Sequence, residues 1–418
     1  MRVSEGSPRR LLIVDVEGPD VEALLSICDE QSIAVYFATL RGVAEVLGQT
    51  THGCVRDGVQ VDYSLPEEAV SKIVSFCQGV GVEGVLTVNE FLTPVVAQVC
   101  HRLRLPGNDP LLARSARNKI EMWERFGSSG MARPKTWIVE NEDDVSELMS
   151  SECLEYPVVV KPCENAGSTG VSVAFNRQEI LDCFRRAKKL NESGPYSDWL
   201  DNRVLVQEYL TGPEYSVESV TRDGHTEHVC VTEKVTTGNE FRVDLGLGVP
   251  ASLDDTTRKS IQEQATKAVE AVGIRNGVSH TEVKVGPSGD CTVVEVAARI
   301  AGGRIAWLVR NALGVDLWQA CIDVAMGKSV EVAATSHGYS AARFIVSDSP
   351  GRLVKLTNVP EVGGSVSEVQ IRRGPGQEIT VDGSSSGRIG HFIVNGNDRD
   401  QVTQEADSLL SRILVEVA

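Results

Sequence analysis

Residues 280–303 read HTEVKVGPSGDCTVVEVAARIAGG and are the most informative stretch of the chain. Apolar and polar side chains alternate on both sides of a run of turn-forming residues, which predicts two strands joined as a β-hairpin. A loop from Pro287 to Asp290 places Glu282 directly opposite Glu295. The same register pairs Lys284 with Val293 and Gly286 with Cys291. Directly opposed side chains share one face with Cβ atoms about 4.5–5.5 Å apart, so two like charges there destabilise the sheet unless something offsets the repulsion.

A bound Mg²⁺ ion would offset that repulsion, because this cation takes one or two carboxylates together with substrate phosphates. The alternative is that Glu282 faces solvent beside Lys284, while Glu295 is a buried or edge residue without a function. Glu295 stands in a run of apolar neighbours, and an ionised carboxylate in such a run needs a partner. We therefore favour a metal site formed by the two glutamates. Arg299, four residues after Glu295, is placed to contact the same anionic ligand.

A second stretch, residues 157–174, reads PVVVKPCENAGSTGVSVA and predicts a strand, a loop and a second strand. Lys161 ends the first strand and can hold nucleotide phosphates as a point charge. The loop contains glycines that tolerate positive φ and the hydroxyl groups of Ser168 and Thr169, and such a loop can wrap an anion. It is not a Walker A loop, because the G-x-x-x-x-G-K-[ST] pattern is absent and no helix follows. Taken alone, the loop is equally typical of a flexible hairpin tip.

Two further segments carry little information alone. Lys119 begins a helical stretch, where an isolated lysine is typical of a solvated surface. Residues 206–214 read VQEYLTGPE and predict a strand that ends in a polar turn.

The length of 418 residues suggests about three domains. In residues 1–112, β-branched apolar runs alternate with helical stretches, which predicts a parallel, Rossmann-like sheet. The dinucleotide fingerprint is missing there, because the first turn reads DVEGPD, so NAD binding is not expected. Residues 113–335 form the predicted core, with a helix near residues 256–272, and residues 336–418 a predicted small α+β lid.

The composition excludes several classes of function. A formal charge of −17 opposes binding to nucleic acid or to an anionic membrane. No run approaches the roughly 20 apolar residues that span a bilayer, and the opening segment lacks a secretory signal, so we expect a cytoplasmic protein. Ten cysteines are scattered without a C-x-x-C pair, which indicates buried, reduced thiols.

The ordered set of these segments resembles the ATP-grasp superfamily. It consists of Lys119, then VVVKP with a small-residue loop, then VQEYLTGPE, then Glu282 and Glu295 followed by ARIAGG. The match spans residues 113 to about 328. It implies an α/β and α+β multidomain fold with a Rossmann-like N-terminal domain, a two-subdomain ATP-grasp core and a small C-terminal lid.

In that superfamily, ATP lies between two sheet-containing subdomains. The resemblance implies that Lys119 and Lys161 hold phosphates, with the loop of Gly167, Ser168 and Thr169 closing over them. It further implies contacts to the nucleoside: the adenine amino group meets Gln207, the adenine ring meets the backbone of Glu208 and Leu210, and the ribose hydroxyls meet Glu214.

The resemblance also implies that Glu282 and Glu295 ligate Mg²⁺, with Mn²⁺ as an alternative ion, and that Arg299 stabilises the transferring phosphoryl group. Two residues depart from the common pattern, since many relatives carry Asn at position 297 and Glu at position 207, where this chain has Ala297 and Gln207. The form EVAARIAGG is similar to the carboxylate–amine ligases that include the L-amino-acid (dipeptide) ligases.

That branch implies a reaction in which a carboxylate attacks the γ-phosphate of ATP and an amine then displaces phosphate. The partners expected are a small-molecule carboxylate and a small-molecule amine, and a homodimer is compatible with the superfamily. Arg304 is a candidate for binding a substrate carboxylate, and Lys234 for approaching the substrate or the phosphates. Surface ion pairs are the alternative for both residues.

Two rival functions stay open at this point. One is an ATP-grasp ligase of the carboxylase-like or purine-pathway type, which product analysis would separate. The other is a catalytically inactive ATP-binding module, which Ala297 favours slightly and the set of Lys161, Glu282, Glu295 and Arg299 opposes.

Overall fold

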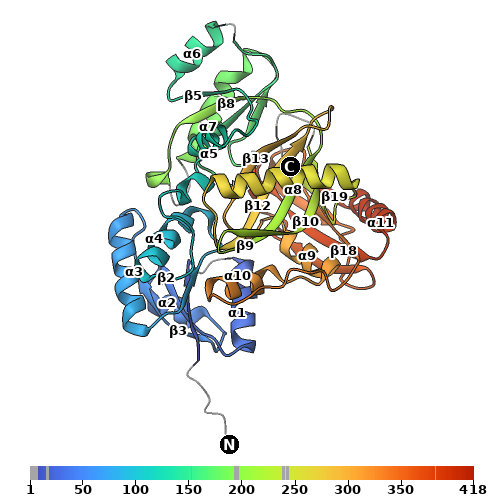
Figure 1. The fold of residues 1–418 in the computed structure, drawn as a ribbon. Coiled ribbons are helices and arrows are strands. Elements are labelled where there is room, and N and C mark those ends of the chain that lie inside the picture. The colour runs from blue at the N-terminus through green and yellow to red at the C-terminus, as the bar shows by residue number, and fades with distance from the viewer. Residues whose placement is uncertain are drawn as a thin grey trace, which may run out of the picture.

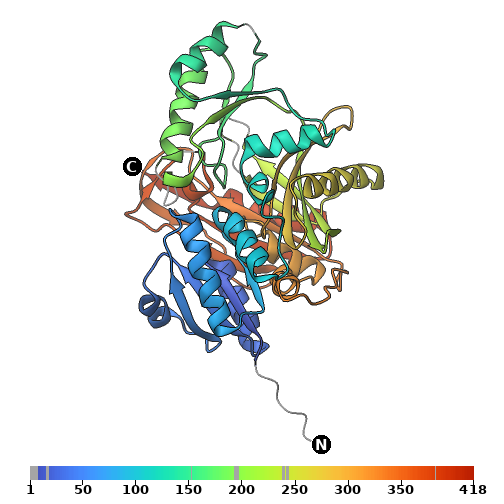
Figure 2. The same ribbon diagram turned by 60° about the vertical axis from the view of Figure 1, so that its left-hand side comes forward.

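In the computed structural model of the protein, the residues described are 8–15, 18–151, 153–192, 197–237, 241, 244–381 and 383–418. Their strands form four sheets. The N-terminal elements and a four-stranded antiparallel sheet lie at opposite ends of the molecule, with an eight-stranded sheet between them (Figures 1 and 2).

The N-terminal sheet is parallel, with the strand order β3-β2-β1-β4, as the alternation of strands and helices predicts. Strand β1 is buried on both faces: Leu11 and Ile13 join one core, and Leu12 and Val14 join another. Val16 and Glu17, which belong to the sequence DVEGPD of the predicted turn, lie outside the described residues. The strands and helices are β1 (Arg10–Val14), α1 (Pro19–Glu30), β2 (Ala34–Thr39), α2 (Val43–Gln49), β3 (Val55–Gln60), α3 (Pro66–Val80), β4 (Gly84–Leu86) and α4 (Thr93–Leu103).

The four-stranded antiparallel sheet has the order β5-β8-β6-β7 and contains the predicted strand, loop and strand as β6 and β7. Side chains alternate along β6, so Val158 and Val160 pack against the helices while Val159 and Lys161 line a cavity on the other face. The elements are α5 (Lys119–Ser128), β5 (Thr136–Val139), α6 (Glu142–Ser150), β6 (Val158–Pro162), β7 (Ser172–Ala174), α7 (Glu179–Asn191) and β8 (Val204–Glu208).

The eight-stranded sheet is antiparallel throughout, with the order β13-β12-β9-β10-β11-β14-β18-β16. The hairpin of β9 and β10 turns at Asp223-Gly224. Its first six elements are β9 (Glu214–Arg222), β10 (His225–Thr236), β11 (Asp244–Val249), α8 (Asp255–Ala271), β12 (Gly277–Val285) and β13 (Cys291–Ala297).

Helix α8 confirms the helix predicted near residues 256–272. The Asp254 carboxylate caps it by accepting hydrogen bonds from the backbone N–H groups of Thr256 and Thr257. Its buried face, which includes Ile261 and Ala265, packs against apolar side chains of β12 and β13 and so supports the hairpin from behind.

The C-terminal elements do not stand apart from the core. Strands β14, β18 and β16 extend the eight-stranded sheet, and β17, β15 and β19 form a small sheet of their own. The predicted boundary near residue 335 and the lid therefore stay predictions. The elements from residue 305 onward are α9 (Ile305–Leu313), α10 (Leu317–Ala325), β14 (Tyr339–Ile345), β15 (Gly351–Thr357), β16 (Val366–Ile371), β17 (Glu378–Ile379), β18 (Gly390–Gly396), α11 (Arg399–Arg412) and β19 (Leu414–Val417).

All ten cysteines are free thiols and, apart from the exposed Cys153, they are buried. Within the described part of the chain, no helix combines the length and the apolar character needed to cross a lipid bilayer.

Candidate active site

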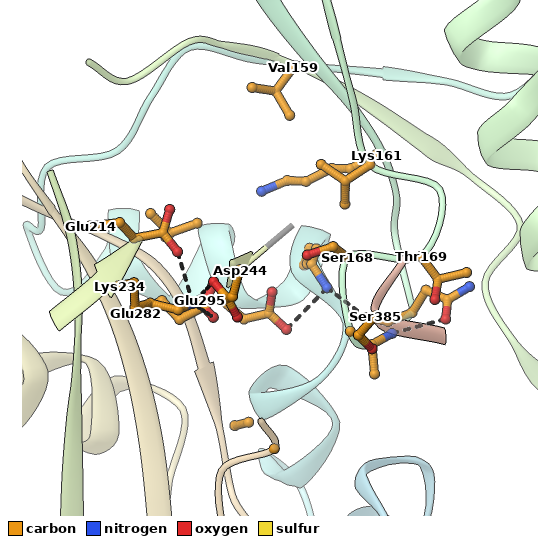
Figure 3. Close-up of a pocket in the computed structure, with 18 of the residues that line it drawn as sticks. Val159, Lys161, Ser168, Thr169, Glu214, Lys234, Asp244, Glu282, Glu295 and Ser385 are labelled. Atoms are coloured by element: carbon orange, nitrogen blue, oxygen red, sulfur yellow. Dashed lines mark hydrogen bonds and ion pairs between the residues drawn. The ribbon is translucent and has the colours of Figure 1, made fainter. Parts of the chain in front are cut away.

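A cavity of about 230 Å³ lies between the four-stranded and the eight-stranded sheet. Lys161, Gln207 and the loop after β6 line it from one side, and the β12–β13 hairpin lines it from the other. Figure 3 shows the acidic side chains of Glu214, Asp244, Glu282 and Glu295 gathered on one side of the cavity, while Lys161 reaches in from another.

The hairpin register confirms that Glu282 lies opposite Glu295. Nearer the turn the prediction is wrong by one residue, because Lys284 pairs with Thr292 rather than Val293, and Gly286 lies beyond the last strand pair, in which Val285 meets Cys291. A register shift between Glu282 and Val283 absorbs the difference. The alternative that Glu282 faces solvent is also wrong, since it lines the cavity with Glu295.

One oxygen of Glu282 is held by two basic side chains. Its Oε1 accepts a hydrogen bond of 2.6 Å from Lys234 Nζ and lies 3.4 Å from His280 Nε2. Burial alone would raise the pKa of Glu282, but Lys234 and His280 outweigh it and hold that pKa well below its usual range. No described residue donates a hydrogen bond to the other oxygen, Oε2.

Lys234 lies at the centre of an acidic cluster and is 5% exposed. Its Nζ is 2.9 Å from Glu214 Oε1 and 3.6 Å from Asp244 Oδ1, in addition to its bond with Glu282. Burial lowers the pKa of a lysine, but these three carboxylates raise that of Lys234 well above the usual value. The surface ion pair considered for Lys234 is therefore excluded.

Glu295 faces a different lysine. Its Oε1 lies 3.2 Å from Nζ of Lys119, which begins α5, is 4% exposed and also bonds to the carbonyl of Asn165. Lys119 is thus not a solvated surface residue. Burial and the neighbouring carboxylates of Glu90 and Glu282 raise the pKa of Glu295, so this carboxylate would gain from a further cation.

Lys161 is buried and makes a cation–π contact with Trp123, at 5.8 Å from the ring centre. Its burial and the positive charge of Lys119 lower the pKa of Lys161 to about 8. Besides Glu295, a further anion between Lys119 and Lys161 would relieve the repulsion between their ammonium groups.

The small-residue loop after β6 adopts left-handed conformations at Gly167, Ser168 and Gly170, with φ values of 63°, 61° and 77°. Gly167, Ser168 and Thr169 line the cavity. The carbonyl of Gly167 accepts a 2.9 Å hydrogen bond from the backbone N–H of Ser385, so a C-terminal segment lies against the loop (Figure 3).

Gln207, Glu208 and Leu210 line the cavity at the end of β8. The Gln207 amide nitrogen donates to the hydroxyl of Thr136. The backbone N–H of Glu208 donates to the Lys135 carbonyl, and the Glu208 carboxylate accepts from the Lys135 N–H. These contacts fix the strand end in place.

Arg299 lines the same cavity and is paired with Glu90, which follows β4 of the N-terminal sheet. Burial lowers the pKa of an arginine, but Glu90 raises that of Arg299. Arg304 lies beside the cavity rather than on its wall, which Gly303 and Ile305 form instead. It pairs with Glu368, and its guanidinium stacks 3.5 Å above the centre of the Trp307 ring.

Five residues of this region were not predicted from the sequence: Glu90, Asp244, His280, Ser385 and Arg388. His280 could have been predicted, because it stands two residues before Glu282 and side chains two apart share a face of a strand. The others come from distant segments with no local motif. Arg388 reaches the carbonyl of Asp244 at 3.1 Å.

The donors on the hairpin suit a hard divalent cation. Mg²⁺ prefers oxygen ligands and takes one or two carboxylates together with phosphate oxygens. The described residues contain no cluster of three or more histidine, cysteine or acidic side chains arranged to hold a metal without a substrate. Two opposed carboxylates, one with an uncommitted oxygen, therefore fit an ion that arrives with a nucleotide.

Comparisons with known proteins agree with this geometry. Residues 154–306 match the ATP-grasp domain family, and residues 343–418 match the L-amino acid ligase C-terminal domain 2. The chain is 27% identical over 287 residues to alanine–anticapsin ligase of Bacillus subtilis (strain 168), covering 65% of this chain and 60% of that protein. It is 28% identical over 258 residues to dapdiamide A synthase of Enterobacter agglomerans, covering 58% of each. The chain thus spans about 60% of the length of these curated relatives.

Among solved structures, an L-amino acid ligase from Bacillus licheniformis superposes with a TM-score of 0.80 at 20% sequence identity, covering 98% of this chain and 99% of that one. That likeness extends the shared fold over nearly the whole molecule. The chain therefore contains an ATP-grasp domain and an L-amino acid ligase C-terminal domain, and its relatives include carboxylate–amine ligases.

Proposed function

We propose that the protein is an ATP-dependent carboxylate–amine ligase. It joins an amino acid or another carboxylate to an amine through an acyl phosphate and releases ADP and phosphate. The observation that carries the proposal is the cavity itself, in which the opposed carboxylates of Glu282 and Glu295 face the buried ammonium groups of Lys119 and Lys161. Such a set of charges suits a magnesium-bound nucleoside triphosphate.

In this proposal the nucleotide lies between the two sheets. Lys119 and Lys161 hold its phosphates under the loop of Gly167, Ser168 and Thr169. The adenine lies at the end of β8, against Gln207, Glu208 and Leu210, and Glu214 meets the ribose. The support is that all of these residues line one cavity.

Glu282 and Glu295 would hold Mg²⁺, or Mn²⁺ in its place. The bound ion supplies positive charge at the phosphate oxygens, where negative charge develops during transfer. The protein's own contribution is to fix the two carboxylates on one face of a rigid hairpin.

The chemistry follows from the poor leaving group of a carboxylic acid at neutral pH. A substrate carboxylate oxygen attacks the γ-phosphorus of ATP, the bond to the β,γ-bridging oxygen breaks, and ADP leaves. The amine nitrogen then attacks the acyl carbon, phosphate departs, and the nitrogen loses a proton. In this proposal Arg299, held by Glu90, stabilises the transferring group, and Arg304, which lies beside the cavity, meets a substrate carboxylate.

The relatives favour L-amino acids as substrates. Their names describe a ligase of alanine with anticapsin, a synthase of dapdiamide A and a ligase of L-amino acids, and this chain shares the C-terminal domain of the last group. A homodimer, which the resemblance allows, is tested separately by light scattering of the purified protein.

The test is a screen of amino-acid pairs with Mg²⁺ and ATP, read as ADP release and as product mass. We expect ADP release only when a carboxylate and an amine are both present, together with a product whose mass equals their sum less one water. ADP release that requires bicarbonate instead would indicate a carboxylase-like enzyme. Nucleotide binding without any turnover across the screen would indicate an inactive module.

A further inference from the structure

The Glu218–His280 pair lies beside the proposed metal site and has no part in the function proposed above. We propose that His280 is a positioning residue for the cation: it holds Oε1 of Glu282, with Glu218 behind it, so that Oε2 of Glu282 faces the ion. The proposal rests on the proposed function, since it takes Glu282 as a metal ligand.

The register of three neighbouring strands places the residues concerned in two adjacent rows. In one row, His280 on β12 lies between Glu218 on β9 and Ala297 on β13. In the next row, Glu282 lies between Ser216 and Glu295 on the same three strands. Because residues two apart on a strand share a face, the side chains of both rows point the same way.

Hydrogen bonds connect these rows. Nδ1 of His280 lies 2.9 Å from Glu218 Oε1, and its Nε2 lies 3.4 Å from Glu282 Oε1. The hydroxyl of Ser216 donates to Glu218 Oε1 at 2.8 Å. Both ring nitrogens therefore face a carboxylate, which fixes the plane of the ring.

The small side chain opposite His280 leaves the ring open to the cavity. Ala297 presents only a methyl group, and both residues line the cavity wall. Glu218 is 0% exposed and does not line it. His280 thus connects the buried Glu218 to Glu282 at the cavity wall.

Stability alone does not account for such an arrangement. A buried ion pair often contributes little net stability, because its desolvation cost offsets its Coulomb attraction. A partner that fixes the orientation of a metal ligand has a larger effect on metal affinity, about 10- to 100-fold when it is removed.

Asparagine and glutamine at position 280 separate the two contacts of the ring. The Asn amide nitrogen occupies nearly the place of Nδ1, so His280→Asn keeps the bond to Glu218 and loses the one to Glu282. The Gln amide nitrogen occupies nearly the place of Nε2, so His280→Gln keeps the bond to Glu282. A matched control is His228→Asn, because His228 on β10, two strands away from β12, is also held on both ring nitrogens, by Ser219 and Thr266, and does not line the cavity.

The experiment titrates Mn²⁺ into full-length protein with saturating ADP and follows free Mn²⁺ by electron paramagnetic resonance. We expect about 10- to 100-fold weaker Mn²⁺ binding in His280→Asn, with His280→Gln and His228→Asn within about threefold of wild type. Affinity for ADP without metal should be unchanged in all of them. Wild-type Mn²⁺ affinity in His280→Asn, or an equal loss in the Asn and Gln variants, would overturn the proposal.

Two further outcomes of the experiment are also informative. If His280→Asn does not fold, Glu218→Gln removes the charge behind the ring at constant volume, and an unchanged Mn²⁺ affinity in that variant would overturn the proposal. If wild-type protein itself binds no Mn²⁺ with ADP, the metal site of the proposed function fails, and this inference fails with it. Normal binding in wild type and in His280→Asn would remove this inference alone.

Discussion

Glu282 and Glu295 lie opposite each other on one hairpin, yet their surroundings drive their pKa values in opposite directions. Lys234 and His280 hold the pKa of Glu282 low, whereas burial and neighbouring carboxylates raise that of Glu295. The paired glutamates could be predicted from the alternation in the sequence. Their basic partners could not, because Lys119 and Lys234 come from other elements and nothing in the local pattern shows that they are buried.

The Glu295→Gln variant tests the metal role at this scale. We expect turnover to fall by at least about a hundredfold, because the loss of a metal ligand removes several kcal/mol of charge stabilisation. The melting temperature should change little, since the substitution relieves repulsion from Glu282 while its amide oxygen still accepts from Lys119. ADP release and differential scanning fluorimetry measure the two effects.

Glu227→Gln is the matched control, because Glu227 lies exposed on β10 of the same sheet and away from the cavity. Its activity should equal that of wild type. Wild-type ADP release by Glu295→Gln would remove Glu295 from the proposed site.

The β12–β13 hairpin was predicted in part from its sequence pattern. Alternation and turn residues predicted the opposed glutamates, but the register shift between them and the turn left no signal in the sequence. The helix α8 was predictable because its cap and its apolar spacing are local. Short strands such as β3 and β16 were missed, since their sequences VRDGVQ and VSEVQI read as polar segments.

The loop after β6 yields a prediction for Gly167→Ala. A Cβ at Gly167 would lie 2.6 Å from the Ser385 hydroxyl oxygen, and the φ of 63° disfavours alanine. We expect the KM for ATP to rise about three- to tenfold, because a displacement costing about 1 kcal/mol weakens binding by that order.

The control for the loop is Gly130→Ala, at which φ is 68° and no atom lies within 4 Å of the added Cβ. It carries the same backbone strain without the contact, and its KM for ATP should stay at the wild-type value. Equal values of KM in the two variants would show that the contact with Ser385 does not shape the loop.

The contacts of His52 with α1 predict a pH-dependent stability of the region around the N-terminal sheet. It lies between α2 and β3, with Nδ1 at 2.7 Å from Asp29 and Nε2 at 3.0 Å from Glu22, both on α1. Burial opposes the charged form, but these hydrogen bonds outweigh it and raise the pKa of His52. The stabilisation is therefore complete below the unfolded pKa of about 6.5 and is lost as pH rises through the higher folded value.

We expect His52→Ala to lower the melting temperature by about 1–3 °C more at pH 6 than at pH 9. The exposed His225→Ala variant serves as the control and should show no such difference. Equal losses at both pH values would contradict a contribution from the charge of His52.

On the scale of the whole molecule, the site is assembled from every part of the chain. Glu90 of the N-terminal domain pairs with Arg299, and Ser385 near the C-terminus contacts Gly167. Such pairs are separated by more than 200 residues, so no local pattern predicts them. The order of motifs predicted the superfamily, but not that the C-terminal strands would continue the sheet that carries the glutamates.

The proposed acyl phosphate can be tested by following one oxygen atom. A carboxylate substrate found in the screen is labelled with ¹⁸O on its carboxyl group and incubated with the enzyme, ATP, Mg²⁺ and the amine. An acyl phosphate requires that one labelled oxygen pass from the substrate to each phosphate released. We predict one ¹⁸O per inorganic phosphate by mass spectrometry, whereas amide formation with unlabelled phosphate would contradict the account.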